Sequence, residues 1–378
     1  MRSVPDTTGL EARITHGARV TSAHGRLQGL CQDGWVRAVQ YDEFGSVPAI
    51  VEVPDPIAPE DGVVVRVAAT GVCRSDWHAW KGHDDSVRLP HVPGHEFAGV
   101  VSSVGAGVTR FAVGDRVTAP FVFACGSCAE CLEGATQVCT RQQQPGFTLP
   151  GSYAESVVVP HADVNLVALP DAVGFAEAAG LGCRFGTAYH ALHARGRVAA
   201  GEWVVVYGCG GVGLSTVIVA VAAGAQVVAV DVSDAALERA AALGAVVVTM
   251  DADAVDTVRS LTGGGAHLSV DAFGSRATSV AAVASLRPRG RHVQVGLLLD
   301  DEAAPAIPMG RVIGEELELR GSHGISVGEY AAMLDDVVAG RLRPAESIGR
   351  TIGFDELPAA LVAMDRPATS AGMTVAVV

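Results

Sequence analysis

Four cysteines within one short segment constrain the fold of this chain more than any other feature of its sequence. In CGSCAECLEGATQVC they follow the spacing C-x2-C-x2-C-x7-C. Four thiolates this close together can converge on one tetrahedral Zn²⁺ and leave no position open for a substrate. Two disulfides or an iron–sulfur cluster are the alternatives, but disulfides are rare in cytosolic chains and the bacterial ferredoxin run is spaced differently. We therefore predict a structural zinc site formed by Cys125, Cys128, Cys131 and Cys139.

Length and composition suggest a globular protein of about two domains, because 378 residues exceed one ordinary hydrophobic core. Hydrophobic residues make up 49% of the chain and charged residues 18%. No apolar run is long enough to cross a bilayer, so we expect a soluble, cytoplasmic protein with no membrane partner. A net charge of −14 without an arginine-rich stripe argues against nucleic acid as a partner.

The succession of strand and helix patterns predicts two different architectures along the chain. From Val36 onward, short runs such as VRAVQYDEF, GVVVRVAATGV and EFAGVVSSVG, broken by Pro and Gly, indicate a mostly β region. After about residue 185, the apolar run WVVVY suits a strand buried on both faces, and LSTVIVAVAAG suits a helix. The alternation continues through QVVAVD, a helix with Ser233 as its N-cap, AVVVTM, HLSVDAFG, RHVQVGLL and ELELRGSHG. This order predicts a doubly wound parallel sheet, with the final TVAVV returning to the first region.

A glycine-rich turn lies between the strand WVVVY and the helix that follows it. Its glycines allow a tight turn and close backbone approach, so that a pyrophosphate can sit at the positive end of the helix. Such a hexapeptide alone is weak evidence, but Asp231 ends the next strand, 18 residues after Gly213. A carboxylate there accepts hydrogen bonds from the adenosine ribose and repels a 2′-phosphate. Its alternative role is to cap the next helix. The pattern therefore favours NAD over NADP.

Residues able to hold a second metal are scattered more widely. GVCRSDWHAWKG carries Cys73, VPGHEFAGVV carries His95, and GLGCRFGTAYHAL carries Cys183. Spacing alone leaves this set inconclusive, because a single buried cysteine is more often a small apolar residue than a ligand.

From Val36 onward the chain resembles the zinc-dependent alcohol dehydrogenases of the medium-chain dehydrogenase/reductase superfamily, specifically the microbial type. The motifs CRSDWHAW, GHEFAGVV, the four-cysteine segment, LGCRFGTA and GCGGVG occur in the family's order. The resemblance implies an α/β protein with a GroES-like, mostly β catalytic domain at 36–184 and 322–378 and a Rossmann NAD-binding domain at 185–321. It also implies two zinc ions per subunit and reversible hydride transfer from a zinc-bound alkoxide to NAD, giving an aldehyde or ketone.

Carried over motif by motif, Cys73, His95 and Cys183 would hold a catalytic zinc ion with one position open. Asp76 would orient the His95 ring and fix its tautomer, and Glu96 would lie close behind the metal. These roles rest on the resemblance, since Asp76 in another context would be an ordinary turn residue.

The resemblance also implies a proton relay and a coenzyme site. Ser75 would bind the reacting oxygen and pass its proton toward His78 at the surface, although both could be ordinary surface residues. The coenzyme would contact Arg74, Thr187, Gly208, Gly210, Gly211, Val212, Gly213, Asp231 and Gly296.

Some features depart from the family pattern or leave alternatives open. The closing strand GMTVAVV lacks the arginine that the family often has near the coenzyme phosphates, which makes Arg74 the main candidate for that charge. Trp80 and Phe121 either line the substrate cleft or pack in the core. The long insertion of the dimeric animal enzymes is missing, so we expect a homotetramer by analogy. A polyol or formaldehyde dehydrogenase is the alternative activity, and a non-catalytic zinc and nucleotide binding module is the weaker one.

Residues 1–35 match nothing in the family pattern, whereas VRAVQYDEFG at Val36 resembles the family's usual opening strand. They show little periodicity and have no apolar face to bury. We therefore expect Val36 to be the natural start, with residues 1–35 an over-extended translation, or else residues 1–35 to be a disordered extension.

Overall fold

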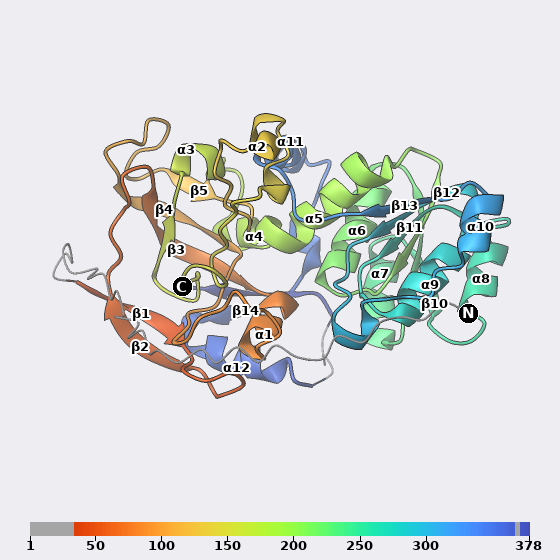
Figure 1. The fold of residues 1–378 in the computed structure, drawn as a ribbon, viewed down its shortest axis with the longest axis horizontal. Coiled ribbons are helices and arrows are strands. Elements are labelled where there is room, and N and C mark those ends of the chain that lie inside the picture. Colours follow the sequence, from red (N-terminus) through yellow and green to blue (C-terminus); the bar gives the residue numbers. More distant parts are fainter. Residues whose placement is uncertain (1–33, 367–370) are drawn as a thin grey trace, which may run out of the picture. The chain divides into compact units, whose positions relative to one another are not determined.

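Two sheets, one parallel and one mixed, organise the part of the chain that the structure describes (Figure 1). The computed structural model describes residues 34–366 and 371–378. Within these residues, no helix is both long and apolar enough to span a membrane. The expected extension at 1–35 lies outside the described residues except for Gly34 and Trp35, and Trp35 pairs with Pro54.

The parallel sheet has six strands in the order β10-β9-β8-β11-β12-β13, and each neighbouring pair is parallel. Strand β8 is buried on both faces, because Val204 and Val206 belong to one hydrophobic cluster and Val205 and Tyr207 to another. This confirms the prediction from WVVVY. The strands are β8 (Trp203–Tyr207), β9 (Gln226–Asp231), β10 (Val246–Thr249), β11 (Ala266–Asp271), β12 (Leu286–Gln294) and β13 (Glu318–Gly321).

Helices alternate with these strands, as the sequence pattern predicts. They are α6 (Gly211–Ala222), α7 (Asp234–Ala242), α8 (Ala254–Leu261), α9 (Arg276–Ala284) and α10 (Met309–Gly314), with a short 3₁₀ turn η4 (Asp300–Glu302). The predicted N-cap of α7 is confirmed, because Ser233 Oγ accepts a hydrogen bond from the Ala236 N–H. The order of the strands reverses between β8 and β11, and ligands of doubly wound sheets bind at the carboxyl ends of the strands at such a point.

The mixed sheet follows the path β14-β15-β3-β4-β5-β7, and β6 also pairs with β3. The C-terminal strand β15 pairs antiparallel with β3, which confirms that TVAVV returns to the first region. The strands are β3 (Val63–Val72), β4 (Phe97–Val104), β5 (Arg116–Thr118), β6 (Ser156–Val159), β7 (Val167–Ala168), β14 (Ile348–Gly353) and β15 (Met373–Val377). A separate antiparallel pair joins β1 (Trp35–Gln40) to β2 (Ala49–Pro54).

Short helical segments connect these strands. The α-helices are α1 (Arg74–Trp80), α2 (Ala129–Leu132), α3 (Ala162–Asn165), α4 (Phe175–Ala179), α5 (Gly186–His190), α11 (Val327–Val338) and α12 (Leu357–Ala363). Two π-helical segments, η2 (Leu181–Phe185) and η3 (Ala191–Gly196), flank α5. The 3₁₀ turns are η1 (Thr136–Val138), η5 (Pro344–Ser347) and η6 (Phe354–Glu356).

The antiparallel pairing of β3 with β4 determines where the site forms. Thr70 near the end of β3 lies opposite Phe97 at the start of β4. Cys73 therefore follows one strand at the same edge of the sheet where His95 precedes the other. Cys183 comes from the π-helical segment η2, and π-bulges often mark functional sites.

Candidate metal centres and coenzyme site

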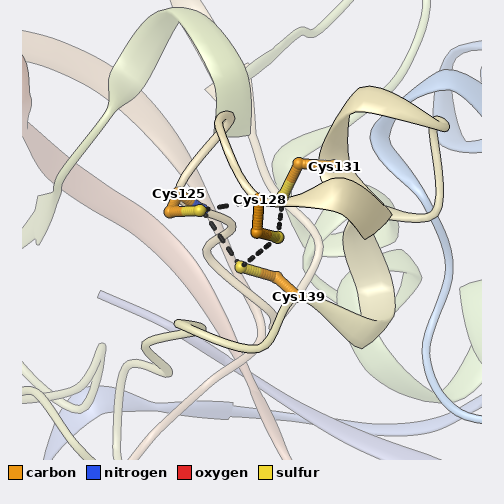
Figure 2. Close-up of side chains that lie close together, drawn as sticks. All are labelled: Cys125, Cys128, Cys131 and Cys139. Carbon is orange, nitrogen blue, oxygen red and sulfur yellow. Dashed lines mark hydrogen bonds between the residues drawn. The ribbon is translucent and has the colours of Figure 1, made fainter.

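The four cysteines of the short segment surround one point (Figure 2). All four are free thiols, and their Sγ atoms lie within 4.8 Å of one another. The Sγ of Cys128 lies 3.3 Å from that of Cys131 and 3.7 Å from that of Cys139, and the Sγ of Cys125 lies 4.0 Å from that of Cys131. Zn–S bonds of about 2.3 Å put tetrahedral thiolates about 3.8 Å apart, so these residues fit a zinc ion.

The environment of Cys125 favours the thiolate that a metal requires. The backbone N–H of Ser127 is the main cause that lowers the pKa of the Cys125 thiol, to about 5. The Arg141 guanidinium also donates to Cys125 Sγ over 3.2 Å. A metal binds the deprotonated thiol, so both contacts favour occupation of the site.

Cys73, His95 and Cys183 converge on a second point, although 88 residues separate His95 from Cys183. Their ligand atoms lie within 4.8 Å of one another. The Nε2 atom of His95 is buried and has no hydrogen-bond partner among the described residues. Burial of an unpaired polar atom costs free energy, and a metal ion would remove that cost. A Cys₂His set fits zinc with one position open.

The polar surroundings prepare Cys73 for a metal. A hydrogen bond from Cys183, together with His95 and the charge of Arg184, lowers the pKa of the Cys73 thiol well below its usual range. The ligand set therefore includes one thiol that ionises readily.

Asp76 holds His95 in one tautomer. Its side chain is fully buried, and its Oδ1 accepts from His95 Nδ1 over 2.8 Å and from the Gly94 N–H over 3.1 Å. Its Oδ2 accepts from the Cys73 N–H and from the Tyr153 hydroxyl, each over 3.0 Å. A carboxylate can only accept, so the proton of the imidazole resides on Nδ1, and Nε2 keeps the lone pair that a metal needs.

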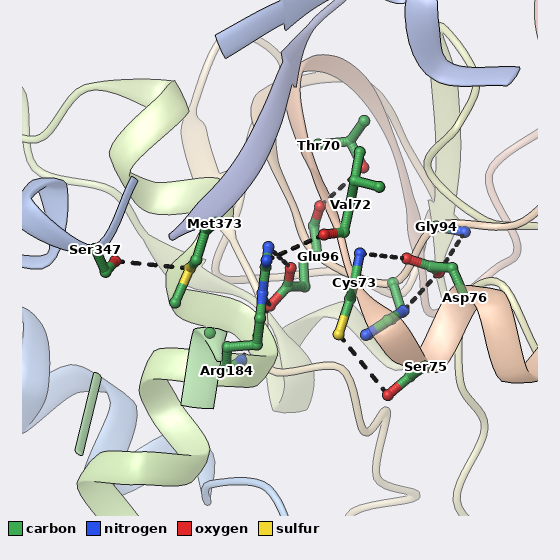
Figure 3. Close-up of polar contacts among 12 residues, drawn as sticks. Thr70, Val72, Cys73, Ser75, Asp76, Gly94, Glu96, Arg184, Ser347 and Met373 are labelled. Carbon is green, nitrogen blue, oxygen red and sulfur yellow. Dashed lines mark hydrogen bonds and ion pairs between the residues drawn. The ribbon is translucent and has the colours of Figure 1, made fainter. Parts of the chain in front are cut away.

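Glu96 forms a buried ion pair with Arg184 beside these ligands (Figure 3). The two side chains are 0% and 7% exposed. The Arg184 backbone N–H and Nε both donate to Glu96 Oε1, over 3.0 and 3.1 Å, its Nη2 pairs with Oε2, and its Nη1 donates to the Val72 carbonyl over 3.0 Å. Burial alone would lower the pKa of Arg184, but the charge of Glu96 raises it instead. Arg184 therefore stays charged.

The role of Arg184 could not be predicted from the sequence. The available signals were its position directly after Cys183 and the absence of an arginine from the closing strand GMTVAVV. Neither signal says where a flexible guanidinium points.

The two residues predicted to relay a proton lie on α1, directly after Cys73. Ser75 Oγ lies 3.8 Å from Cys73 Sγ, which puts the hydroxyl next to a metal ligand. His78 is three residues further along and so lies on the same side of the helix. The Nδ1 of His78 lies 2.9 Å from the Nδ1 of His83, a residue to which the sequence analysis gave no role.

The glycines of the predicted coenzyme turn are favoured at their positions for different physical reasons. Gly208 has φ +88°, and a Cβ on Gly213 would lie 1.8 Å from the Gly208 carbonyl oxygen. A Cβ on Gly211 would lie 2.5 Å from Cδ of Arg184, so this glycine makes room for the arginine. A Cβ on Gly210 would meet no atom of the described residues within 4 Å, so these residues leave room for a ligand there.

Asp231 ends β9 beside this turn. Its Oδ2 accepts from the Cys209 N–H over 2.6 Å, and its Oδ1 accepts from the Ser233 N–H over 2.8 Å. A carboxylate has about four acceptor positions, so two are left for ribose hydroxyls.

The remaining predicted coenzyme residues come from four different segments of the chain. Gly296 follows β12, and a Cβ there would lie 2.2 Å from the Gly274 nitrogen. Val212 is in the first turn of α6, and Thr187 is 6% exposed in α5. Arg74 donates to the Met364 carbonyl over 2.5 Å and stacks 3.6 Å over the Trp77 ring. Its predicted contact with a pyrophosphate stays a prediction.

Two phenylalanines form an aromatic wall beside the metal ligands. The rings of Phe121 and Phe147 lie 6.0 and 5.5 Å from the His95 ring, both edge-on. Trp80 is 1% exposed and packs in a core cluster with Tyr41 and Leu361. The structure thus favours the packing role for Trp80, and the cleft role of Phe121 stays a prediction.

Comparisons with known proteins agree with this arrangement. The family model described as the alcohol dehydrogenase GroES-like domain matches residues 59–171, and the one described as zinc-binding dehydrogenase matches residues 211–339. An alcohol dehydrogenase of Geobacillus stearothermophilus is 38% identical over 75% of this chain and 87% of its own length. A D-arabitol-phosphate dehydrogenase of Enterococcus avium is 31% identical over 85% and 90%. Among solved structures, the alcohol dehydrogenase TADH from Thermus sp. ATN1 superposes with a TM-score of 0.83 at 33% identity, covering 90% of this chain and 99% of that one.

Proposed function

Because this chain belongs to the zinc-dependent alcohol dehydrogenases of the medium-chain dehydrogenase/reductase superfamily, we propose that it oxidises an alcohol to an aldehyde or ketone with NAD⁺. The observation that carries the proposal is the buried Nε2 of His95, which finds no hydrogen-bond partner in the part of the chain that the structure describes and lies within 4.8 Å of two cysteine sulfurs. Cys73, His95 and Cys183 would hold the catalytic zinc ion. When bound, the metal acts as a Lewis acid that lowers the pKa of an alcohol hydroxyl, and NAD⁺ accepts the hydride.

The surrounding residues orient the ligands. Asp76 keeps the proton of His95 on Nδ1 through the 2.8 Å contact, so the ring presents Nε2. Glu96 and Arg184 form a nearly neutral pair behind the ligands, and this limits the net charge close to the reacting atoms. Phe121 and Phe147 exclude water from one side of the site.

Ser75 and His78 would conduct the hydroxyl proton away from this closed site. Ser75 supplies a hydroxyl 3.8 Å from Cys73 Sγ, and His78 supplies an imidazole on the same side of α1. An unperturbed imidazole has a pKa of about 6.5, which suits proton transfer near neutral pH.

The coenzyme would bind at the amino end of α6. The room at Gly210 and the helix N–H groups suit a pyrophosphate. Asp231 would accept ribose hydroxyls and repel a 2′-phosphate, which supports NAD as the preferred coenzyme. The four-cysteine segment would hold a second, structural zinc ion, giving two per chain.

The substrate is less constrained than the reaction. The aromatic wall of Phe121 and Phe147 favours small or flat alcohols. A polyol or formaldehyde dehydrogenase would share both metal sites and differ only in the shape of the cleft. The similarity to a D-arabitol-phosphate dehydrogenase supports this alternative. The homotetramer and the cytoplasmic location stay predictions.

Metal analysis combined with a substrate panel tests the proposal. We expect about two zinc ions per chain, and NAD⁺-dependent oxidation of at least one primary, secondary, aromatic or polyol alcohol. Cys183→Ala should abolish turnover and remove one zinc ion while the far-UV circular dichroism stays unchanged. Full turnover by Cys183→Ala, or an active protein with one zinc ion or none, would exclude the two-site arrangement.

A further inference from the structure

The end of helix α1 holds two histidine rings against each other. The N–H of His83 donates to the His78 carbonyl over 3.0 Å, and the N–H of Gly82 donates to the Ala79 carbonyl over 3.1 Å. Gly82 has φ +78°. These two hydrogen bonds and the left-handed glycine form a Schellman motif. With Lys81 as the C-cap of the helix, this motif brings the side chain two positions after the cap into contact with the side chain three positions before it. In the segment HAWKGH both of these side chains are imidazoles.

The two rings are joined directly. The Nδ1 of His78 lies 2.9 Å from the Nδ1 of His83, and the ring centroids are 5.2 Å apart. One Nδ1 must donate and the other must accept, so the two neutral rings share one proton along this line. Trp77 meets both rings edge-on, with centroids 4.9 and 5.5 Å away, and its Nε1 donates to Asp365 over 2.7 Å. The indole is therefore fixed, and it restrains both imidazoles.

We propose that His83 extends the proton relay of α1 beyond His78, so that the proton leaves the protein at His83. This proposal rests on the proposed function, because it needs His78 to receive the proton of the alcohol. His78 is half-buried and His83 is exposed, so the pair leads from the interior toward water.

The transfer balances without any added reactant except a base in solution. When Nε2 of His78 binds a proton, the shared proton moves from Nδ1 of His78 to Nδ1 of His83. His83 then releases its Nε2 proton to water or to buffer base. One proton enters the pair and one leaves it, and both rings end neutral, with their tautomers exchanged.

The charged groups around the pair are of both signs. Arg74 lies 3.6 Å over the Trp77 ring, and Lys81 lies 5.8 Å from the same ring and pairs with Asp365 over 2.8 Å. Asp84 follows His83 and accepts from Ser86. Charges of both signs therefore lie around the pair among the described residues, and the 2.9 Å contact joins the two rings directly.

Two variants and a matched control test the extended relay. His83→Gln keeps a side chain that can hydrogen-bond but cannot pass a proton, and His83→Ala removes both properties. His161→Gln is the control, because His161 is a half-buried histidine outside α1 with a side-chain partner, Asp61 at 2.5 Å. In the zinc-loaded protein, the histidine ring signals are followed by NMR across pH 5–9, and kcat for alcohol oxidation is measured at several buffer concentrations over the same range.

In the wild type, we expect His78 and His83 to titrate as a coupled pair, and His83→Gln should shift the titration of His78. Both His83 variants should lose about three- to tenfold in kcat below neutral pH, a modest part of the 10²–10⁴ that general acid–base groups supply. Added buffer base should restore the loss, and His161→Gln should behave as wild type. An unmoved His78 titration, or an unchanged kcat–pH profile in His83→Gln, would overturn the extended relay. If wild type oxidises no alcohol, the proposed function fails, while the NMR titration still decides whether the two rings share a proton.

Discussion

Arg184→Met isolates the contribution of the buried ion pair behind the catalytic ligands. Methionine keeps much of the aliphatic stem that lies against Gly211 but removes the guanidinium. Glu96, which is fully buried, then loses its charged partner and two side-chain hydrogen bonds, and the Val72 carbonyl loses its donor. The substitution therefore leaves a carboxylate uncompensated in the interior.

Removal of one partner from a buried ion pair costs about 3–5 kcal/mol, because the remaining charge has neither water nor a counter-ion. At roughly 2–4 °C per kcal/mol, the apparent Tm should fall by on the order of 10 °C. The double variant Glu96→Gln/Arg184→Met should recover part of this loss, because it removes the orphaned charge as well. The matched control is Arg350→Met, since Arg350 and Glu356 form a 3.0 Å ion pair whose side chains are 52% and 53% exposed. Such an exposed pair contributes less than about 1 kcal/mol.

The assay is urea and thermal unfolding of the zinc-loaded protein at fixed zinc concentration, with metal content measured for every variant. If Arg184→Met lost no more stability than Arg350→Met, or if the double variant were the least stable of the set, the ion pair would not be a stabilising element.

Three further predictions concern metal, coenzyme and pH. Cys131→Ala should reduce the zinc content from about two to about one per chain and lower the Tm, because structural zinc contributes to folding. A wild-type Tm that stays unchanged when a chelator removes the zinc would contradict this prediction. Asp231→Ser should raise kcat/KM with NADP relative to NAD by about tenfold or more, or about 1.4 kcal/mol, and a wild type that prefers NADP would contradict the assignment. Burial lowers the pKa of His292, which is 3% exposed. Below the unfolded pKa of about 6.5, the unfolded chain therefore binds the proton more readily than the folded protein. The free energy of unfolding decreases as the pH is lowered, by at most about 1.4 kcal/mol per pH unit. His292→Gln should therefore lose less stability than wild type between pH 7 and pH 5.5 in urea unfolding, and parallel losses would show that other groups dominate.

Local sequence was enough for the features that depend on neighbouring residues. The four cysteines lie within one short segment, so their convergence needs only a compact loop. The strand WVVVY and the N-cap Ser233 were confirmed because burial on both faces and helix capping leave their mark on consecutive residues. The glycine turn and Asp231 could be identified for the same reason, since a strand, a turn and a strand end follow each other along the chain.

The tertiary structure alone decided which distant side chains meet. Cys73, His95 and Cys183 could be grouped only through the family resemblance, because no local pattern encodes the pairing of β3 with β4 or the position of η2. Arg184 supplies the buried charge opposite Glu96, and the room for its stem depends on Gly211, 27 residues further along the chain. His83 joins His78 because a left-handed glycine ends α1 between them. In each case the side chain had several rotamers open to it, and only the packed surroundings select the one that makes the contact.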